Sequence, residues 1–279
     1  MKEFKNKRLR EMNCNKDIPK TTESFQMNDT KVIAFSGKGG VGKTSLAALT
    51  VRLIVEEHPE ARVLAIDADP AIGLSTALGV VVTHTVDDIR KKFIETVGRG
   101  KKKEALEVLN EAHYEITDSL VETERFAFLA IGRPENAGCY CSVNSFLKET
   151  IHVLSEEFDY VVIDGEAGIE QVNRRVMEKV THLILVSDAS KKGIGVIHTI
   201  RDVAMSLGMY NKVGAIINRI KNEAVKNKVD TGDITILNFI PEDDALGMMD
   251  VEGNSLLQLD ENAPALKGLR EALIQIEII

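Results

Sequence analysis

The chain has 279 residues, of which 44% are hydrophobic and 28% charged, and it contains no tryptophan. This length and apolar content suit one large α/β domain with a sizeable core. The net charge of −8 argues against a protein that coats nucleic acid. The sequence contains no run of 18 apolar residues, so we expect no membrane span. Three cysteines do not suggest a disulfide scaffold, and the first 20 residues lack the apolar segment of a secretory signal. We therefore expect a cytoplasmic protein.

The order of apolar and helical segments predicts the fold. Residues 1–29 are polar, mildly basic and aperiodic, so we interpret them as a flexible N-terminal extension. From residue 30 to residue 279, short aliphatic segments alternate with helical patterns, which predicts a doubly wound α/β domain with a mostly parallel sheet flanked by helices. The predicted strands are 31–36, 62–67, 125–131, 159–164, 181–186, 212–218 and 234–240. The predicted helices are 44–57, 86–97, 101–120, 143–156, 170–179, 193–207 and 264–276.

Two of these segments need a separate interpretation. Residues 83–124 are charged and helical without a predicted strand, and we expect a peripheral helical insertion within the 30–279 domain. The helix at 264–276 is amphipathic, but its polar face is not strongly basic. We therefore expect it to pack on the core rather than to anchor the protein to a membrane.

Residues 37–44 form the most informative motif. They read GKGGVGKT and fit the phosphate-loop pattern G-x-x-x-x-G-K-[ST], between a predicted strand and a predicted helix. In such a loop the backbone N–H groups surround the phosphates of a nucleotide, Lys43 reaches the terminal phosphates and Thr44 can hold Mg²⁺. The dipole of the following helix adds to the attraction for phosphate. The expected nucleotide contacts here are Gly37, Lys38, Gly39, Gly40, Val41, Gly42, Lys43, Thr44 and Ser45.

Lys38 is a second lysine that an ordinary phosphate loop does not need. Two ammonium groups in one turn repel each other, so we expect Lys38 to point away, toward a nucleotide held by another subunit. The sequence here resembles the deviant phosphate-loop ATPases with the motif K-G-G-x-G-K-T. These include the nitrogenase iron protein, the arsenite-pump ATPase, the cell-division and plasmid-partition ATPases and the nickel-insertion ATPases of carbon monoxide dehydrogenase. The resemblance covers most of the chain from about residue 31, and it implies an ATP-sandwiched homodimer in which the extra lysine reaches across.

Carboxylates follow the predicted strand 62–67. Asp67 and Asp69 lie in the run Asp-Ala-Asp-Pro, and two carboxylates at a strand end beside a phosphate loop suit Mg²⁺ binding and the positioning of water. The resemblance implies that Asp69, before the proline, orients the attacking water, with Asp67 on the Mg²⁺ side. A turn with a capping aspartate is the alternative interpretation of both residues.

Two further groups at strand ends complete the expected nucleotide site. Asp164 closes an apolar strand, the usual arrangement of a carboxylate that holds Mg²⁺ through water. Gly168 looks like the family's switch glycine, whose N–H senses the γ-phosphate. By the same resemblance, Asn218, Arg219 and Pro241 follow or end later strands at positions that hold the adenine, with Asn218 at the base edge.

Cys139 and Cys141 form a C-x-C pair after the predicted strand 125–131. Two thiolates can chelate a soft or borderline metal ion such as Ni²⁺ or Zn²⁺, but a closed tetrahedral site needs four ligands. A two-fold dimer would supply four thiolates on its axis, and Lys38 implies the same dimer. Two free cysteines without metal, or a [4Fe–4S] cluster bridged by both pairs, are the alternatives.

Comparison within the family narrows this interpretation. The segment GRPENAGC at 132–139 resembles the nitrogenase iron protein around its first cluster cysteine, which matches Cys139. The second cluster cysteine of that protein would fall at Ala167, so the same cluster cannot be built here. The run Gly-Cys-Tyr-Cys and the D-x-E-A-G-x-E stretch at 164–170 look like the nickel-insertion ATPases of carbon monoxide dehydrogenase and the related maturation factor of acetyl-CoA synthase. Their C-x-C pair binds one metal ion at the dimer interface.

The sequence thus predicts a homodimeric Mg-ATP-hydrolysing metallochaperone. ATP and Mg²⁺ are the expected cofactors, with Ni²⁺ or Zn²⁺ at the cysteine pair, and a nickel enzyme of the carbon monoxide dehydrogenase or acetyl-CoA synthase type is the expected partner. Neither nucleic acid nor a membrane is expected as a partner. The alternatives are an iron–sulfur ATPase that donates electrons and a partition or positioning ATPase.

Overall fold

The computed structural model describes residues 30–69, 71, 73–98, 114–132, 141–165, 169, 172–173 and 176–279. The expected extension at 1–29 lies outside these residues, as do most of the expected helix at 101–120 and part of the expected helix at 170–179. The strands are β1 (Lys31–Gly37), β2 (Val63–Asp67), β3 (Val121–Glu122), β4 (Ala127–Ala130), β5 (Tyr160–Asp164), β6 (Val180–Ser187), β7 (Tyr210–Ile220) and β8 (Ile236–Pro241). The helices are α2 (Lys43–Glu57), α3 (Gly73–Leu78), α4 (Val86–Gly98), α6 (Cys141–Ser155), α8 (Lys191–Ser206), α9 (Glu223–Lys226), α10 (Asp244–Glu252), α11 (Pro264–Gln275) and the 3₁₀ helix η1 (Leu256–Gln258).

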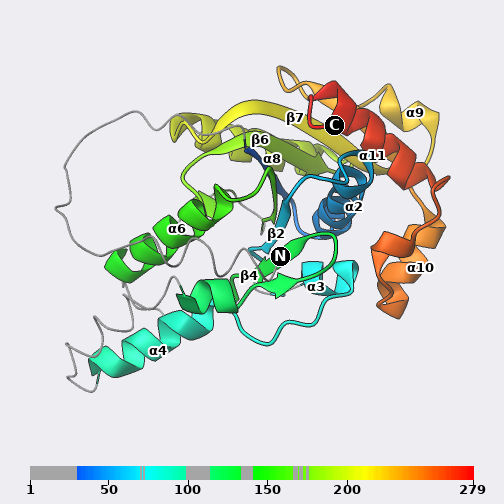
Figure 1. Ribbon diagram of the computed structural model, residues 1–279. Coiled ribbons are helices and arrows are strands. Elements are labelled where there is room, and N and C mark those ends of the chain that lie inside the picture. The colour runs from blue at the N-terminus through cyan, green and yellow to red at the C-terminus, as the bar shows by residue number, and fades with distance from the viewer. Residues whose placement is uncertain are drawn as a thin grey trace.

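The described strands form one eight-stranded sheet in the order β3-β4-β2-β5-β1-β6-β7-β8 (Figure 1). All neighbouring pairs are parallel except β3 with β4. The chain leaves β1 toward β2 on one side and later crosses from β5 to β6 on the other, which makes the carboxyl end of β1 a topological switch point. The doubly wound α/β fold is confirmed, and its switch point lies at the phosphate loop.

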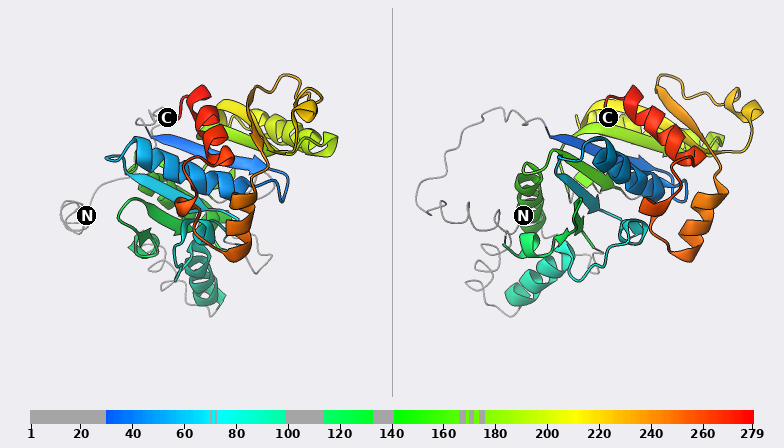
Figure 2. Two further views of the ribbon diagram at one scale, coloured as in Figure 1. Left: turned by 90° about the vertical axis from the view of Figure 1, so that its right-hand side faces the viewer. Right: turned by 45° about the vertical axis from the view of Figure 1, so that its right-hand side comes forward.

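Helices cover both faces of the sheet. Ile33 and Phe35 of β1 pack in the core layer formed with α2 and α11, whereas the alternating residues Val32 and Ala34 pack in the layer formed with α4, α6 and α8. Because successive strand residues point to opposite faces, a strand buried on both sides is apolar throughout. Figure 2 shows α2 and α11 side by side over one face of the sheet.

The C-terminal helix packs as expected. The apolar residues Leu266, Leu269 and Leu273 of α11 are at most 2% exposed. Lys31, at the start of β1, donates through Nζ to the backbone oxygens of Glu277 and Ile278 at 3.0 Å. The apolar face of α11 is therefore part of the core. No helix within the described ranges is long and apolar enough to cross a membrane.

The segment 83–124 differs from the expected insertion without a strand. Its last residues form β3, which pairs antiparallel with β4. Val86 and Ile89 of α4 are buried in the core layer that also includes α6 and α8. The first helix of this segment is therefore part of the domain. A two-residue strand has no sequence pattern of its own, because its pairing is set by the neighbouring strand.

Candidate nucleotide site

The phosphate loop joins the central strand to a buried helix. Gly37 ends β1, where a Cβ atom would lie 2.0 Å from the backbone oxygen of Val186 on β6, so only glycine fits this close approach. Gly42 caps α2 in the left-handed conformation, with φ 94°, and offers no side chain to the helix. The first N–H groups of α2 are therefore left for a ligand, and at a helix start the preferred ligand is an anion such as phosphate.

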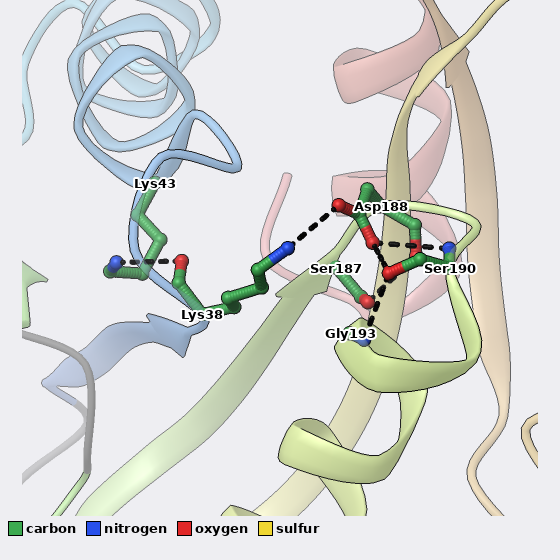
Figure 3. Close-up of polar contacts among 6 residues, drawn as sticks. All are labelled: Lys38, Lys43, Ser187, Asp188, Ser190 and Gly193. Carbon is green, nitrogen blue, oxygen red and sulfur yellow. Dashed lines mark hydrogen bonds and ion pairs between the residues drawn. The ribbon is translucent and has the colours of Figure 1, made fainter.

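The two lysines of the loop point in different directions (Figure 3). Lys43 is 7% exposed, and its Nζ lies 3.3 Å from the backbone oxygen of Lys38, within the loop. Lys38 extends the other way, and its Nζ donates to Oδ2 of Asp188 at 3.2 Å. Lys38 therefore points away from Lys43, and in this single chain its partner is a carboxylate of its own subunit. Its contact with a nucleotide on another subunit stays a prediction.

Thr44 and Asp164 meet below the loop. The Thr44 hydroxyl donates to Oδ2 of Asp164 at 2.6 Å. The other carboxylate oxygen, Oδ1, is buried and has no hydrogen-bond partner among the residues that the structure describes. Burial raises the pKa of Asp164 to about 6, against the lowering effects of the Thr44 hydrogen bond and the Lys43 charge.

These two side chains fit a Mg²⁺ ion. A hydroxyl next to a buried carboxylate with a free oxygen is the hard-oxygen donor set that Mg²⁺ prefers beside nucleotide phosphates. Thr44 and Asp164 would hold the ion, and its charge would neutralise phosphate oxygens. The structure thus supports binding of ATP and Mg²⁺ at the carboxyl edge of the sheet, beside the phosphate loop.

Asp67 and Asp69 lie on the loop that follows β2. Asp67 is fully buried; its Oδ1 accepts from the backbone N–H of Asp69 at 3.1 Å, and its Oδ2 accepts from that of Leu74 at 2.9 Å. Asp67 therefore ties the start of α3 to the end of β2, and it stands beside Asp164 in the register of β2 and β5. Burial and the charge of Asp164 raise the pKa of Asp67 to about 7. Whether Asp67 also contacts Mg²⁺ stays a prediction, as does the role of Asp69 toward water.

The residues expected around adenine lie at the carboxyl ends of β7 and β8. Asn218 is buried, and its Nδ2 donates to the backbone oxygen of Val41 at 2.9 Å, so in this structure it holds the phosphate loop. Arg219 has φ 59°, in the left-handed region that is rare outside glycine, at an irregular point of the β7–β8 pairing. Pro241 ends β8 and pairs with Ile220. Their contacts with a base stay predictions.

Several expected site residues cannot be placed. Gly168, Ala167 and Cys139 lie outside the described residues. Cys141 is the first residue of α6, but its side chain is not described. Among the residues that the structure does describe, no group of three or more His, Cys, Asp or Glu side chains is placed to hold a metal ion.

Asp188 lies beside the phosphate loop and contacts Lys38, but the sequence analysis did not identify it as a site residue. It directly follows β6, and β6 pairs with β1 so that Gly37 stands opposite Val186. The only signal was an aspartate after an aliphatic strand, the same signal that pointed to Asp164.

The loop, its buried lysine and the Thr44–Asp164 pair, at the switch point of a doubly wound sheet, define a P-loop ATPase. The particular family follows from comparison. The chain belongs to the CobQ/CobB/MinD/ParA nucleotide binding domain family, whose model matches residues 32–256.

Individual relatives agree with this assignment. An uncharacterized ATP-binding protein of Methanocaldococcus jannaschii is 34% identical over 86% of this chain and 96% of its own length. The carbon monoxide dehydrogenase accessory protein CooC of Rhodospirillum rubrum is 28% identical over 87% of this chain and 94% of its own length. The solved structure of the Pyrococcus furiosus cell division ATPase MinD superposes with a TM-score of 0.63 at 23% identity, covering 88% of this chain and 98% of that one. At that identity the likeness concerns the fold alone.

Proposed function

We propose that the protein is a homodimeric Mg-ATPase that carries a metal ion, with nickel as the first candidate, to a nickel enzyme under maturation. The observation that carries the proposal is the C-x-C pair in a chain similar over nearly its whole length to a carbon monoxide dehydrogenase accessory protein. Two thiolates per subunit give a four-thiolate site only when two subunits meet.

The position of β4, the strand that precedes the cysteines in the sequence, supports a link between metal and nucleotide. The segment with Cys139 and Cys141 connects the end of β4 to the start of α6. Ala130, the last residue of β4, stands opposite Asp67 in the strand register. Because parallel strands end at the same edge of a sheet, β4 ends at the edge that holds the phosphate loop, a few residues before the cysteines in the sequence.

The chemistry assigned to the site is hydrolysis of ATP to ADP and phosphate. Lys43 and the loop N–H groups bind the phosphate oxygens, and the negative charge that develops on them in the transition state is stabilised there. Asp69 orients the water that attacks the γ-phosphorus, and Lys38 of each subunit reaches the nucleotide of the other. Closure around ATP brings the four thiolates together, and hydrolysis separates them so that the metal ion is released.

Cysteine variants of the full chain test the metal-carrier role. Cys139→Ser and Cys141→Ser should each abolish stoichiometric Ni²⁺ or Zn²⁺ binding, because a serine hydroxyl is a poor ligand for these ions at neutral pH. ATP hydrolysis should stay within about twofold of the wild type, because the cysteines are not among the phosphate-binding groups. Cys14→Ser, which changes the third cysteine of the chain, is the matched control and should keep the metal. Metal retained after loss of Cys139 and Cys141 contradicts the proposal.

A positioning ATPase is the second candidate, because the fold is shared with a cell division ATPase. Salt-dependent pelleting with DNA or binding to liposomes would support it. The net charge of −8 disfavours both surfaces, since each is itself negatively charged.

A further inference from the structure

Asp188 is built into the junction between β6 and α8. Its Oδ1 accepts hydrogen bonds from both the backbone N–H of Ser190, at 3.1 Å, and the Ser190 hydroxyl. Ser190 is also the N-cap of α8, where its Oγ accepts from the N–H of Gly193 at 3.0 Å. A Cβ atom on Gly193 would lie 2.4 Å from Oδ1 of Asp188, so the helix begins directly against the carboxylate. The carboxylate is therefore held in one place by a strand end and a helix start (Figure 3).

The remaining oxygen of Asp188 faces the phosphate loop. Oδ2 accepts from Lys38 Nζ at 3.2 Å. Desolvation raises the pKa of Asp188, but the hydrogen bonds from Ser190 and Lys38 outweigh it and lower the pKa below its ordinary value. Asp188 is thus a carboxylate at neutral pH, and Lys38 is its counter-ion across 150 residues of chain.

The ion pair between Lys38 and Asp188 is partly exposed to solvent and can open at low cost. The side chains of Lys38 and Asp188 are 34% and 35% exposed, so either charge can be rehydrated when the contact opens. The ammonium of Lys38 cannot pair with Asp188 of its own subunit and bind a nucleotide on another subunit at the same time. Within one subunit, the contact therefore competes with the dimer.

We propose that Asp188 is a positioning residue for Lys38: it holds this lysine on its own subunit and thereby sets the protein concentration at which ATP joins two subunits. The inference rests on the proposed function, because it needs the ATP-bound homodimer. Partly exposed ion pairs of this kind shift an equilibrium by about 1.4- to 5-fold, and a dimer breaks two such pairs, so the expected effect is about 2- to 25-fold.

Asp188→Asn tests the proposal, because asparagine keeps the size of the side chain and removes its charge. Sedimentation of the full chain with a non-hydrolysable ATP analogue measures the dimer dissociation constant. We expect this constant to fall by about 2- to 25-fold in the variant. The affinity of the monomer for ADP should not change, because Asp188 does not face Lys43. Asp233→Asn, which removes the exposed ion pair of Arg201 with Asp233, is the control and should leave dimerisation as in the wild type.

A double variant identifies the residue through which Asp188 acts. In a Lys38→Ala background, Asp188→Asn should have no further effect on dimerisation, because the lysine that it positions is absent. Ser190→Ala, which removes one hydrogen bond from the carboxylate, should shift dimerisation in the same direction but by less. It replaces Asp188→Asn as the test if that variant does not fold.

An unchanged or raised dissociation constant in Asp188→Asn, or an effect that persists without Lys38, overturns the proposal. A wild type that stays monomeric with the ATP analogue overturns the dimer itself, and with it both the proposed function and this inference.

Discussion

The hydroxyl of Thr44 donates a 2.6 Å hydrogen bond to Asp164 and so joins the first turn of α2 to the carboxyl end of β5. Oδ1 of Asp164 stays buried, with no hydrogen-bond partner in the described part of the chain. A buried carboxylate oxygen without a hydrogen bond is costly, and such costs persist where function requires them. This unsatisfied oxygen is what we expect if a metal ion binds here beside the nucleotide.

Asp164→Asn should stabilise the ligand-free protein and disable it. Burial raises the pKa of Asp164 to about 6. The protonated carboxyl group therefore stabilises the fold at a pH below the pKa of the unfolded chain, and this contribution is lost as the pH rises through 6. At pH 8 the buried charge is fully present, so its removal should raise the free energy of unfolding by about 1–3 kcal/mol. ATP hydrolysis should fall by at least about 100-fold. Denaturant titration and a phosphate-release assay measure the two effects, and a less stable variant at pH 8 would contradict this account.

Asp67→Asn should slow hydrolysis without weakening nucleotide binding. An asparagine can accept one of the two backbone hydrogen bonds, from Asp69 or Leu74, but its Nδ2 would face the other N–H. The loop that carries Asp69 would then be misplaced, and kcat should drop by about 10- to 100-fold with ADP affinity within about threefold. If instead kcat recovers at high Mg²⁺ concentration, Asp67 is a metal-side residue and not a loop anchor.

Gly37→Ala should prevent normal folding, whereas Gly39→Ala should not. A Cβ atom at Gly37 would lie 2.0 Å from the backbone of β6, but a Cβ atom at Gly39 would have no described neighbour within 4 Å. Backbone atoms in a central strand pair cannot move aside, so we expect a loss of at least about 3 kcal/mol at position 37 and less than about 0.5 kcal/mol at position 39. Soluble yield and thermal unfolding compare the two variants. Equal stability would mean that β1 and β6 are not in the register described.

Acid should destabilise the sheet edge opposite the phosphate loop through His182. Burial, with the charges of Lys212 and Lys31, lowers the pKa of His182 to about 4. An unfolded histidine binds its proton near pH 6.5, so between pH 6.5 and 4 the unfolded state binds more protons and stability is lost as the pH falls. His182→Gln should remove about 1–3 kcal/mol of this dependence. His84→Gln, at an exposed position, controls for the loss of a histidine and should keep the slope of the wild type.

The sequence predicts the strands well because burial on both faces leaves a continuous aliphatic signature. The run at 31–36 predicts β1, observed as Lys31–Gly37. Elements without such a signature are missed. None of the residues of α10 is buried, so no apolar periodicity marks the helix. The pairing of β3 depends on β4 and not on its own two residues.

The candidate site divides in the same way. The phosphate loop and Asp164 are local motifs at strand ends, and their neighbours in space follow from the motif. The contact between Lys38 and Asp188 depends on β6 lying next to β1, and that order cannot be taken from either segment alone. The bonds that Asp67 makes to Asp69 and Leu74 depend on the exact path of the loop.

The metal and sulfide content per dimer, measured by elemental analysis after anaerobic purification and exposure to nickel, tests the central claim most directly. The account predicts about one nickel or zinc ion per two chains and no acid-labile sulfide, because four thiolates form one tetrahedral site. About four iron atoms with matching sulfide would contradict it and would indicate an ATP-gated electron donor. Absence of any bound metal would equally contradict the metal-carrier role.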